Sequence, residues 1–469
     1  MATKAATIRV GVLAGRREIG GCFHGSFRAD SGEVLNGPFL FTAGSRLAPA
    51  DSRHRPPDDG RIVLRTREGN RSLTPREHHF FPERRAFFSL DEVTIGVNFH
   101  WERREGQTFQ GSLAVLVEPD GTLTAVNEID REDYLASVIS SEMAATAPRE
   151  FLKAHAVIAR SWLMAMLEKK QTVTASAVDR GGVASAGGSR AAEREDAAEE
   201  IIRWYGREEH KRFDVCADDH CQRYQGMTKI ISEEARRAVD ATRDLVLVYD
   251  GKICDTRYHK ACGGRTEDFA NVWEDVTVPY LISVADGPGS FPPVADEAAA
   301  AAWITGRPDA YCNPGDVSAL PRILPDFDQE TRDFFRWEVS YDREELEALL
   351  KRRAGLDFGE LRALIPLKRG PSGRIISLKI EGSRRTAIVG KELEIRRWLS
   401  PSHLYSSAFV VETEREATGK VTRFKLLGAG WGHGVGLCQI GAAMMALRGF
   451  PMEAILRHYF PGTTLRQIT

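Results

Sequence analysis

DREDYLASVISSEMAATAPREFLKAHAVIARSWLMAML, residues 130–167, is the stretch of the sequence that decides the fold. Its first half predicts an amphipathic helix that begins at Asp130, because a short acidic side chain caps a helix N-terminus and suits the helix dipole. Apolar residues recur on one face of this helix, at Leu135 and Ile139, and Glu142 occupies the next position of that face. Burial raises the pKa of a carboxyl group, so we expect Glu142 to act as a general acid. The alternative is that the face has already turned into solvent at the helix end.

The second half of the stretch predicts a buried helix. Pro148 stands in its first turn, where the missing backbone N–H costs nothing, and residues 151–167 are apolar on almost every side. A helix of this kind belongs at the centre of a domain. Arg160 interrupts the apolar surface, and a buried guanidinium needs a carboxylate or several carbonyls as partners. Glu142 is a candidate for that carboxylate.

Three blocks of the chain together resemble one known family. They are SVISSEMAATAPREFLKAHAVIARSW (137–162), YHKACGGRTEDFANVWEDVTVPYLISVAD (258–286) and GAGWGHGVGLCQIGAAMMALRGFPMEAILRHYFPGTTL (428–465). In this order they resemble the motifs of the SpoIID/LytB family, the sporulation stage II protein D and amidase-enhancer group. The resemblance implies a lytic transglycosylase that cuts peptidoglycan glycan strands. It also implies that Glu142, the Glu of the SEM motif, is the catalytic acid.

Glycine-rich loops in the second and third blocks are candidates for contact with the substrate. Gly263 and Gly264 permit close approach of the backbone to a ligand, and residues 428–442 hold six glycines with His433 among them. The family usually has small hydroxyl residues before the first glycine pair, whereas this chain has the sequence KAC there. We expect the substrate-binding residues to be Arg160, Tyr258, His259, Gly263, Gly264, Trp431, His433 and Gln439.

A third group of candidate residues lies in EEHKRFDVCADDHCQRYQG, residues 208–226. Cys216, His220 and Cys221 fall within six residues, and His210 lies six residues before Cys216. Thiolate and imidazole ligands so close together suit tetrahedral zinc, and the acidic residues between them indicate a polar loop. The alternative is that the two cysteines are small core residues and His220 caps a turn. We expect a structural zinc with His210, Cys216, His220 and Cys221 as ligands, and no organic cofactor.

The seven cysteines of the chain are spread thinly, which argues against a small scaffold held by disulfides. Because their number is odd, at least one thiol stays free or binds a metal. Cys438 lies close to His433, but a helix is expected to follow it, so we interpret it as a packed small residue and not as a nucleophile.

Composition limits the fold and the partners of this 469-residue chain. Its 64 basic and 66 acidic residues nearly cancel, so no long-range field favours nucleic acid, and no run of about 18 apolar residues predicts a membrane span. The pattern predicts an α+β fold, rich in antiparallel hairpins, with a buried central helix pair and a small inserted helical subdomain. The expected segments are a β-rich region (1–128), the catalytic helices and metal loop (129–285, with a flexible insertion at 168–200), the helical subdomain (286–370) and a C-terminal part with the GWGHGVG loop (371–469).

These observations favour a lytic transglycosylase that acts on glycan strands without stem peptides, between N-acetylmuramic acid and N-acetylglucosamine. One carboxylate suffices for this reaction, whereas ordinary glycosidases need two. Two alternatives are a non-catalytic module that enhances a partner N-acetylmuramoyl-L-alanine amidase, and a zinc hydrolase centred on Cys216, His220 and Cys221. We expect an extracytoplasmic protein associated with the cell wall, although MATKAATIRVGVLAG has no apolar segment of secretory length.

Overall fold

The computed structural model describes residues 6–43, 61–73, 76–97, 102–179, 198–204, 210–289, 291–294, 296–315, 317–330 and 333–468. The chain forms two compact units. Unit 1 comprises Met1–Thr146 and Glu209–Ala241, and unit 2 comprises Ala147–Glu208 and Thr242–Thr469. The chain leaves unit 1 just after the SEM motif and returns to it just before the predicted metal ligands. The two helices of residues 130–167 therefore belong to different units.

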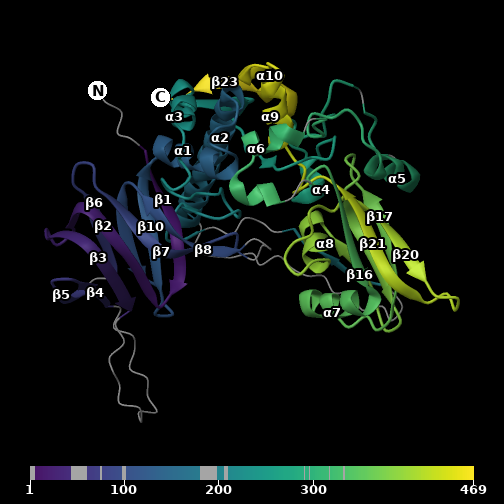
Figure 1. Cartoon of the computed structure of the whole chain (residues 1–469), viewed down its shortest axis with the longest axis horizontal. Coiled ribbons are helices and arrows are strands. Elements are labelled where there is room, and N and C mark those ends of the chain that lie inside the picture. The colour runs from purple at the N-terminus through teal and green to yellow at the C-terminus, as the bar shows by residue number, and fades with distance from the viewer. Residues whose placement is uncertain are drawn as a thin grey trace, which may run out of the picture. The chain divides into compact units, whose positions relative to one another are not determined.

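Unit 1 is built on an 11-stranded sheet, drawn in purple and blue in Figure 1. Its main path has the order β12-β1-β10-β9-β6-β2-β3-β4-β5, and β7 pairs with β2 and β8. Neighbouring strands are antiparallel except β1 and β12, which are parallel. The strands are β1 Thr7–Arg16, β2 Glu18–Ala29, β3 Val34–Ala43, β4 Ile62–Thr66, β5 Gly69–Leu73, β6 Glu77–Pro82, β7 Phe87–Ile95, β8 Arg103–Phe109, β9 Ser112–Val117, β10 Leu123–Asp130 and β12 Val215–Cys216. Aromatic side chains such as Phe27, Phe80 and Phe109 fill its core.

Helix α1 (Arg131–Glu142) follows β10 directly. Asp130 caps it as predicted, because the side chain of Asp130 accepts a hydrogen bond from the backbone N–H of Glu132 at 2.8 Å. Helix α3 (Glu233–Ala241) packs against α1 within the same unit. Leu135 and Ile139 are fully buried, so the predicted apolar face of α1 is confirmed.

Unit 2 is organised around helix α2 (Arg149–Asp179), which packs against β13 (Leu245–Tyr249), α9 (Gln439–Leu447) and α10 (Met452–Tyr459). The side chains of residues 151–163 are buried apart from Lys153. The prediction of a buried central helix is therefore confirmed for α2.

A second hydrophobic core in unit 2 lies among two sheets and two helices. One sheet has the order β11-β19-β18-β17 and the other has the order β16-β21-β20. Their elements are β11 Glu199–Ile202, β16 Arg336–Asp342, α7 Arg343–Ala354, β17 Leu361–Arg369, β18 Ile375–Gly382, β19 Thr386–Gly390, α8 Glu392–Trp398, β20 Phe409–Arg415 and β21 Val421–Ala429. The remaining elements of unit 2 are short: β14 Lys252–Ile253, β15 Tyr258–His259, α4 Phe269–Val272, α5 Glu297–Thr305, η1 Val317–Ala319, α6 Leu320–Ile323, η2 Asp326–Glu330, β22 Leu437–Cys438 and β23 Thr464–Gln467.

The predicted α+β class with mainly antiparallel sheets is confirmed, but two segments differ from expectation. Residues 168–179, predicted to begin a flexible insertion, continue helix α2, because their Ala, Glu, Lys and Gln residues are good helix formers. The middle of that insertion, 180–197, lies outside the described residues, and β11 follows. Residues 286–370 contain strands β16 and β17 besides helices, and both pair with strands later in the chain.

Candidate functional site

Glu142 ends helix α1 with only 7% of its surface exposed. The apolar face of α1 thus remains in the core up to its last residue, and the alternative that it turns into solvent is wrong. The backbone N–H of Arg223 donates a hydrogen bond to Glu142 Oε1 at 3.0 Å. This bond fixes one oxygen of a buried carboxyl group, which is the preorganisation that an acid–base catalyst requires.

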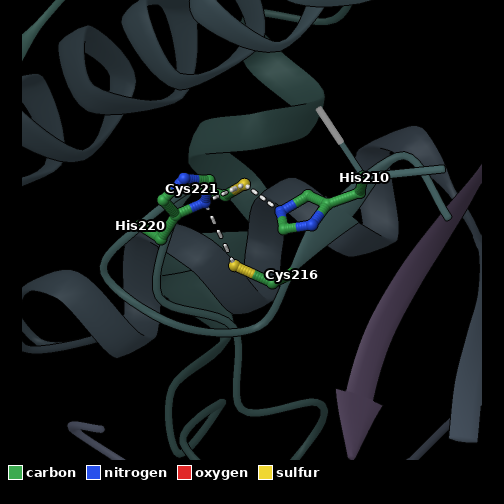
Figure 2. A group of neighbouring side chains, drawn as sticks. All are labelled: His210, Cys216, His220 and Cys221. Carbon is green, nitrogen blue, oxygen red and sulfur yellow. Dashed lines mark hydrogen bonds between the residues drawn. The ribbon is translucent and has the colours of Figure 1, made fainter. Parts of the chain in front are cut away.

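The four predicted zinc ligands lie together in the same unit (Figure 2). One ligand atom from each residue, an imidazole nitrogen or a thiol sulfur, lies within 4.8 Å of the other three. His210 Nε2 is 3.3 Å from Cys221 Sγ, and His220 Nδ1 is 3.5 Å from Cys221 Sγ and 3.8 Å from Cys216 Sγ. Around a tetrahedral zinc with bonds of about 2.0 to 2.3 Å, the edge between a nitrogen and a sulfur is about 3.5 Å. The donor set and its spacing therefore fit zinc.

The sheet of unit 1 holds one side of this cluster. Strand β12 pairs with β1 so that Cys216 lies opposite Gly11. The backbone N–H of Ala217 donates to Gly11 O at 3.0 Å, and the backbone N–H of Arg9 donates to Asp214 Oδ2 at 3.0 Å. Position 11 requires glycine, because the ring of Phe213 lies 2.6 Å from where a Cβ would stand. The position of Cys216 is thereby set by the edge of the sheet.

The residues after Cys221 join the cluster to Glu142. Arg223, two residues further on, places its guanidinium in a fork on Asp219, with contacts of 3.0 and 3.1 Å. Gln222 accepts a hydrogen bond from the hydroxyl of Tyr134 in α1 at 3.1 Å. The segment that carries the metal ligands is thus the segment whose backbone holds the carboxyl group of Glu142.

Pairing of two short strands brings the glycine-rich motifs of unit 2 together. Strand β15 pairs with β22 so that His259 lies opposite Cys438. Ala261 and Trp431 exchange backbone hydrogen bonds of 3.1 and 2.7 Å. Two motifs that are more than 160 residues apart in the sequence therefore form one surface.

His433 presents a defined tautomer in this surface. Its Nδ1 accepts the backbone N–H of Val435 at 3.1 Å, so the ring proton belongs on Nε2. Desolvation, and then electrostatic interactions with His259 and Arg257, hold the pKa of His433 well below its ordinary value. A neutral imidazole with an Nε2–H donor suits a hydroxyl or amide oxygen of a sugar.

Trp431 forms an aromatic platform with Tyr405. The two rings stack with centroids 4.1 Å apart and an interplanar angle of 24°. Both residues are half-buried. The backbone N–H of Gly432 donates to Tyr405 O at 2.8 Å, which fixes the loop against this platform. The ring of Phe334 also packs against the indole of Trp431, with centroids 4.8 Å apart, and a role of Trp431 in sugar binding stays a prediction.

The two glycines of the YHKACGG motif are required by packing inside unit 2. A Cβ on Gly263, which has φ +84°, would lie 2.9 Å from the backbone nitrogen of Gly430. A Cβ on Gly264, at φ +112°, would lie 2.9 Å from the ring of Trp303. The close approach that these glycines permit is made by the protein itself, and their contact with a substrate stays a prediction.

The other predicted binding residues of unit 2 are mostly enclosed. Arg160 is fully buried and donates to the carbonyl of Leu245 at 3.0 Å, so a carbonyl is one of its partners as expected. Gln439 is 2% exposed at the start of α9. Tyr258 is half-buried with its ring edge-on to His155. The substrate-binding roles of these residues stay predictions, as does the pairing of Arg160 with Glu142.

Comparisons with known proteins agree with the motifs. Residues 119–249 match the family described as stage II sporulation protein, and residues 267–436 match a domain of unknown function, DUF8618. The chain is 23% identical over 347 residues to stage II sporulation protein D of Bacillus subtilis, an alignment that covers 73% of this chain and 76% of that protein. It is 25% identical over 255 residues to the amidase enhancer of Bacillus subtilis, covering 50% of this chain and 33% of that protein. These matches support the assignment of the chain to the SpoIID/LytB family.

A third relative spans more of the sequence. An uncharacterized protein of Brachyspira hyodysenteriae is 26% identical over 391 residues, which cover 82% of this chain and 80% of that protein. By contrast, the chain matches only a third of the amidase enhancer.

Sequence reasoning missed Arg223, whose backbone N–H holds Glu142, and the two neighbouring residues that anchor the same segment. Arg223 carries no pattern that connects it with a glutamate 81 residues earlier in the chain, and neither does Gln222 or Asp219. The useful signal was indirect, because all three lie beside the predicted zinc ligands.

Proposed function

We propose that this protein is a cell-wall enzyme, a lytic transglycosylase that cleaves peptidoglycan glycan strands with Glu142 as its catalytic residue. The observation that carries the proposal is the buried carboxyl group of Glu142, held at Oε1 by the backbone N–H of Arg223. Membership in the SpoIID/LytB family supports it. Because Oε1 accepts a hydrogen bond, the acidic proton belongs on Oε2.

One carboxyl group can carry both halves of the reaction. Glu142 donates its proton to the glycosidic oxygen as the bond from that oxygen to C1 of N-acetylmuramic acid breaks. The carboxylate then accepts the proton of the muramyl 6-hydroxyl, and the oxygen of that hydroxyl forms a bond to C1. This step closes the anhydro ring and restores the acid. The loop that carries the predicted zinc ligands also contains Asp219. Its carboxylate is held in a fork by the guanidinium of Arg223, so it is not suited to activate water.

A zinc ion at His210, Cys216, His220 and Cys221 would stabilise the loop without taking part in this chemistry. Four protein ligands fill a tetrahedral shell, which is characteristic of structural sites. The chain's own contribution is to position the N–H of Arg223, two residues beyond the last ligand.

The residues of unit 2 favour glycan strands without stem peptides. Stem peptides carry carboxylates and amines, which a binding site must pair with charges. The cations in and directly after the YHKACGG motif already have partners: Lys260 pairs with Asp328 at 2.7 Å, and Arg265 donates to Ser283 Oγ at 3.2 Å. His433 and Trp431 remain to contact the uncharged hydroxyl and N-acetyl groups of the sugars.

A second candidate function is the enhancement of a partner cell-wall amidase, which the name of one relative suggests. In that case the glycine-rich surface of unit 2 would bind glycan, and Glu142 would be dispensable. We expect an extracytoplasmic, cell-wall-associated protein under either function. Within the described residues, no helix is long and apolar enough to cross a membrane.

The test of the proposal is the variant Glu142→Gln. It keeps the shape of the side chain but cannot donate the proton, so the rate of glycan cleavage should fall at least about a hundredfold. Release of anhydro-muramyl ends, followed by mass spectrometry, measures this rate without any added amidase. Glu132→Gln is the matched control, because Glu132 is a buried glutamate at the other end of α1 that pairs with Arg131. Unchanged cleavage by Glu142→Gln would refute the assignment, and absence of anhydro ends from the parent protein would favour the amidase-enhancing module.

A further inference from the structure

A second group of metal-ligating side chains lies entirely within unit 2. One ligand atom from each of Cys262, Asp286, Cys312 and Cys438 lies within 4.8 Å of the other three, and none of the four residues is more than 2% exposed. We propose that these three thiols and one carboxyl group bind a second structural zinc ion. The proposal does not depend on the enzymatic activity of the protein.

The distances suit a metal more than a disulfide. Cys262 Sγ is 3.4 Å from Cys312 Sγ and 3.1 Å from Asp286 Oδ2. A disulfide would bring two sulfurs to about 2.05 Å. Around a tetrahedral zinc the edge between two sulfurs is about 3.8 Å, and the edge between a sulfur and an oxygen is about 3.5 Å. Shifts of a few tenths of an ångström therefore convert the cluster into a coordination shell.

Backbone donors already point at the sulfurs. Cys438 Sγ accepts the N–H of Cys262 at 3.3 Å and the N–H of Gly441 at 3.4 Å, the latter in the first turn of α9. Cys262 Sγ accepts the N–H of Gly264 at 3.3 Å. Hydrogen bonds to a negatively charged acceptor are stronger than those to a neutral one, so these donors would suit the sulfurs of Cys438 and Cys262 as zinc-bound thiolates.

The carboxyl group of Asp286 is also held in place. The hydroxyl of Tyr459 donates to Asp286 Oδ1 at 2.5 Å, while the other oxygen faces Cys262. Gly441 makes room for it, because a Cβ there would lie 2.7 Å from Asp286 Oδ2. An outer hydrogen bond on a ligating carboxylate is the usual way in which a protein orients it.

The surrounding positive charges complement the net negative charge of the proposed zinc complex. Zinc with three thiolates and one carboxylate carries a net charge of −2, by counting two positive and four negative charges. Two largely buried guanidinium groups lie beside the ligands: Arg374 donates to Cys262 O at 3.2 Å, and Arg336 donates to Gly263 O at 3.0 Å.

The proposed centre would join segments that are distant in the sequence. Cys262 belongs to the YHKACGG motif and Cys438 to the glycine-rich loop that carries His433. Cys312 lies in the segment between α5 and α6. With four protein ligands and no exposure, the site is closed, which is characteristic of a structural metal centre.

The experiment measures zinc in the full chain after the first site has been removed. Cys216→Ser with Cys221→Ser eliminates two ligands of the unit 1 site and leaves the unit 2 cluster intact. Protein purified without chelator should then hold about one zinc ion, whereas the parent should hold about two. Adding Cys312→Ser to the double variant should reduce the content to nearly none. Cobalt loaded into the double variant should give thiolate-to-cobalt absorption that Cys312→Ser weakens.

Cys254→Ser is the matched control, because Cys254 is a fully buried free cysteine of unit 2 outside both clusters. Its zinc content should equal that of the parent. A double variant that folds and holds no zinc would overturn the proposal even if Cys312→Ser cannot be produced. A Cys262–Cys312 disulfide, detected by alkylating the denatured protein before and after reduction, would overturn it as well.

Discussion

His155 is a buried histidine in the middle of α2, and its ionisation is unfavourable in the folded state. The ring is fully buried between Phe151 and Tyr258, and neither ring nitrogen has a hydrogen-bond partner among the described residues. Burial, and then the charge of Lys260, lower the pKa of His155 from 6.5 to about 3. The folded protein therefore holds the neutral ring, whereas the unfolded chain binds a proton below its ordinary pKa.

His155→Leu should make unit 2 less sensitive to acid. As the pH falls from 6.5 towards 3, the unfolded chain binds one more proton at this position than the folded one, so the parent loses about 1.4 kcal/mol of stability per pH unit from this group. Leucine does not titrate and fills a similar volume. Thermal unfolding between pH 4 and 7.5 should show a shallower decline for the variant. His24→Leu serves as a control at an exposed position, and an equal acid response of His155→Leu and parent would contradict this account.

At the scale of elements, the loop 210–226 is tied down at several points. The N–H of Cys221 donates to Asp218 O at 3.0 Å, and the N–H of Tyr224 donates to Ala217 O at 3.0 Å. Gly226 adopts φ +57°, and a Cβ there would lie 2.2 Å from Thr108 O. The loop has no helix and only the two-residue strand β12, so bound zinc should supply much of its stability.

Removal of the zinc ion predicted at the unit 1 site should therefore release this loop. Trypsin should cut after Arg223, which is 7% exposed, in chelator-treated protein or in Cys216→Ser, but not in the metal-bound parent. Glycan cleavage should fall at the same time, because the N–H of Arg223 would no longer hold Glu142. Cys22→Ser, at a half-buried free cysteine of β2, is the control. Full activity and the same cleavage pattern after complete metal removal would argue against a structural role.

For the whole molecule, the prediction concerns the form of the substrate. Because Lys260 pairs with Asp328 and the guanidinium of Arg265 donates to Ser283 Oγ, both cations already have partners, and peptide carboxylates should gain little there. Peptidoglycan pretreated with an amidase should therefore be cleaved at least about tenfold faster than intact material, which corresponds to about 1.4 kcal/mol. Soluble anhydro-muramyl products measure both rates with the same enzyme. Equal or faster release from the intact material would point to an enzyme that recognises stem peptides.

Local features of the chain were predictable because they depend on neighbours in sequence. Asp130 caps α1 and the Asp250–Gly251 turn joins β13 to β14, since capping and turn chemistry act within a few residues. The cluster of His210 with Cys216 and its neighbours was predictable for the same reason: only a short loop has to close. Helix α8 lacks such a local signal, because no side chain caps its first turn.

By itself, the sequence determined the α+β class and the buried α1 and α2, which follow from periodicity and short spacings. The family motifs were recognised by resemblance of whole blocks of sequence. Only the tertiary structure decided that α1 and α2 belong to different compact units. It alone brought the N–H of Arg223 to Glu142, and Asp286 and Cys312 to Cys438. In the sequence, Arg223 lies 81 positions from Glu142, and Asp286 and Cys312 lie 152 and 126 positions from Cys438. At such separations the approach of two side chains is set by sheet pairing and core packing, which leave no periodic signal in the chain.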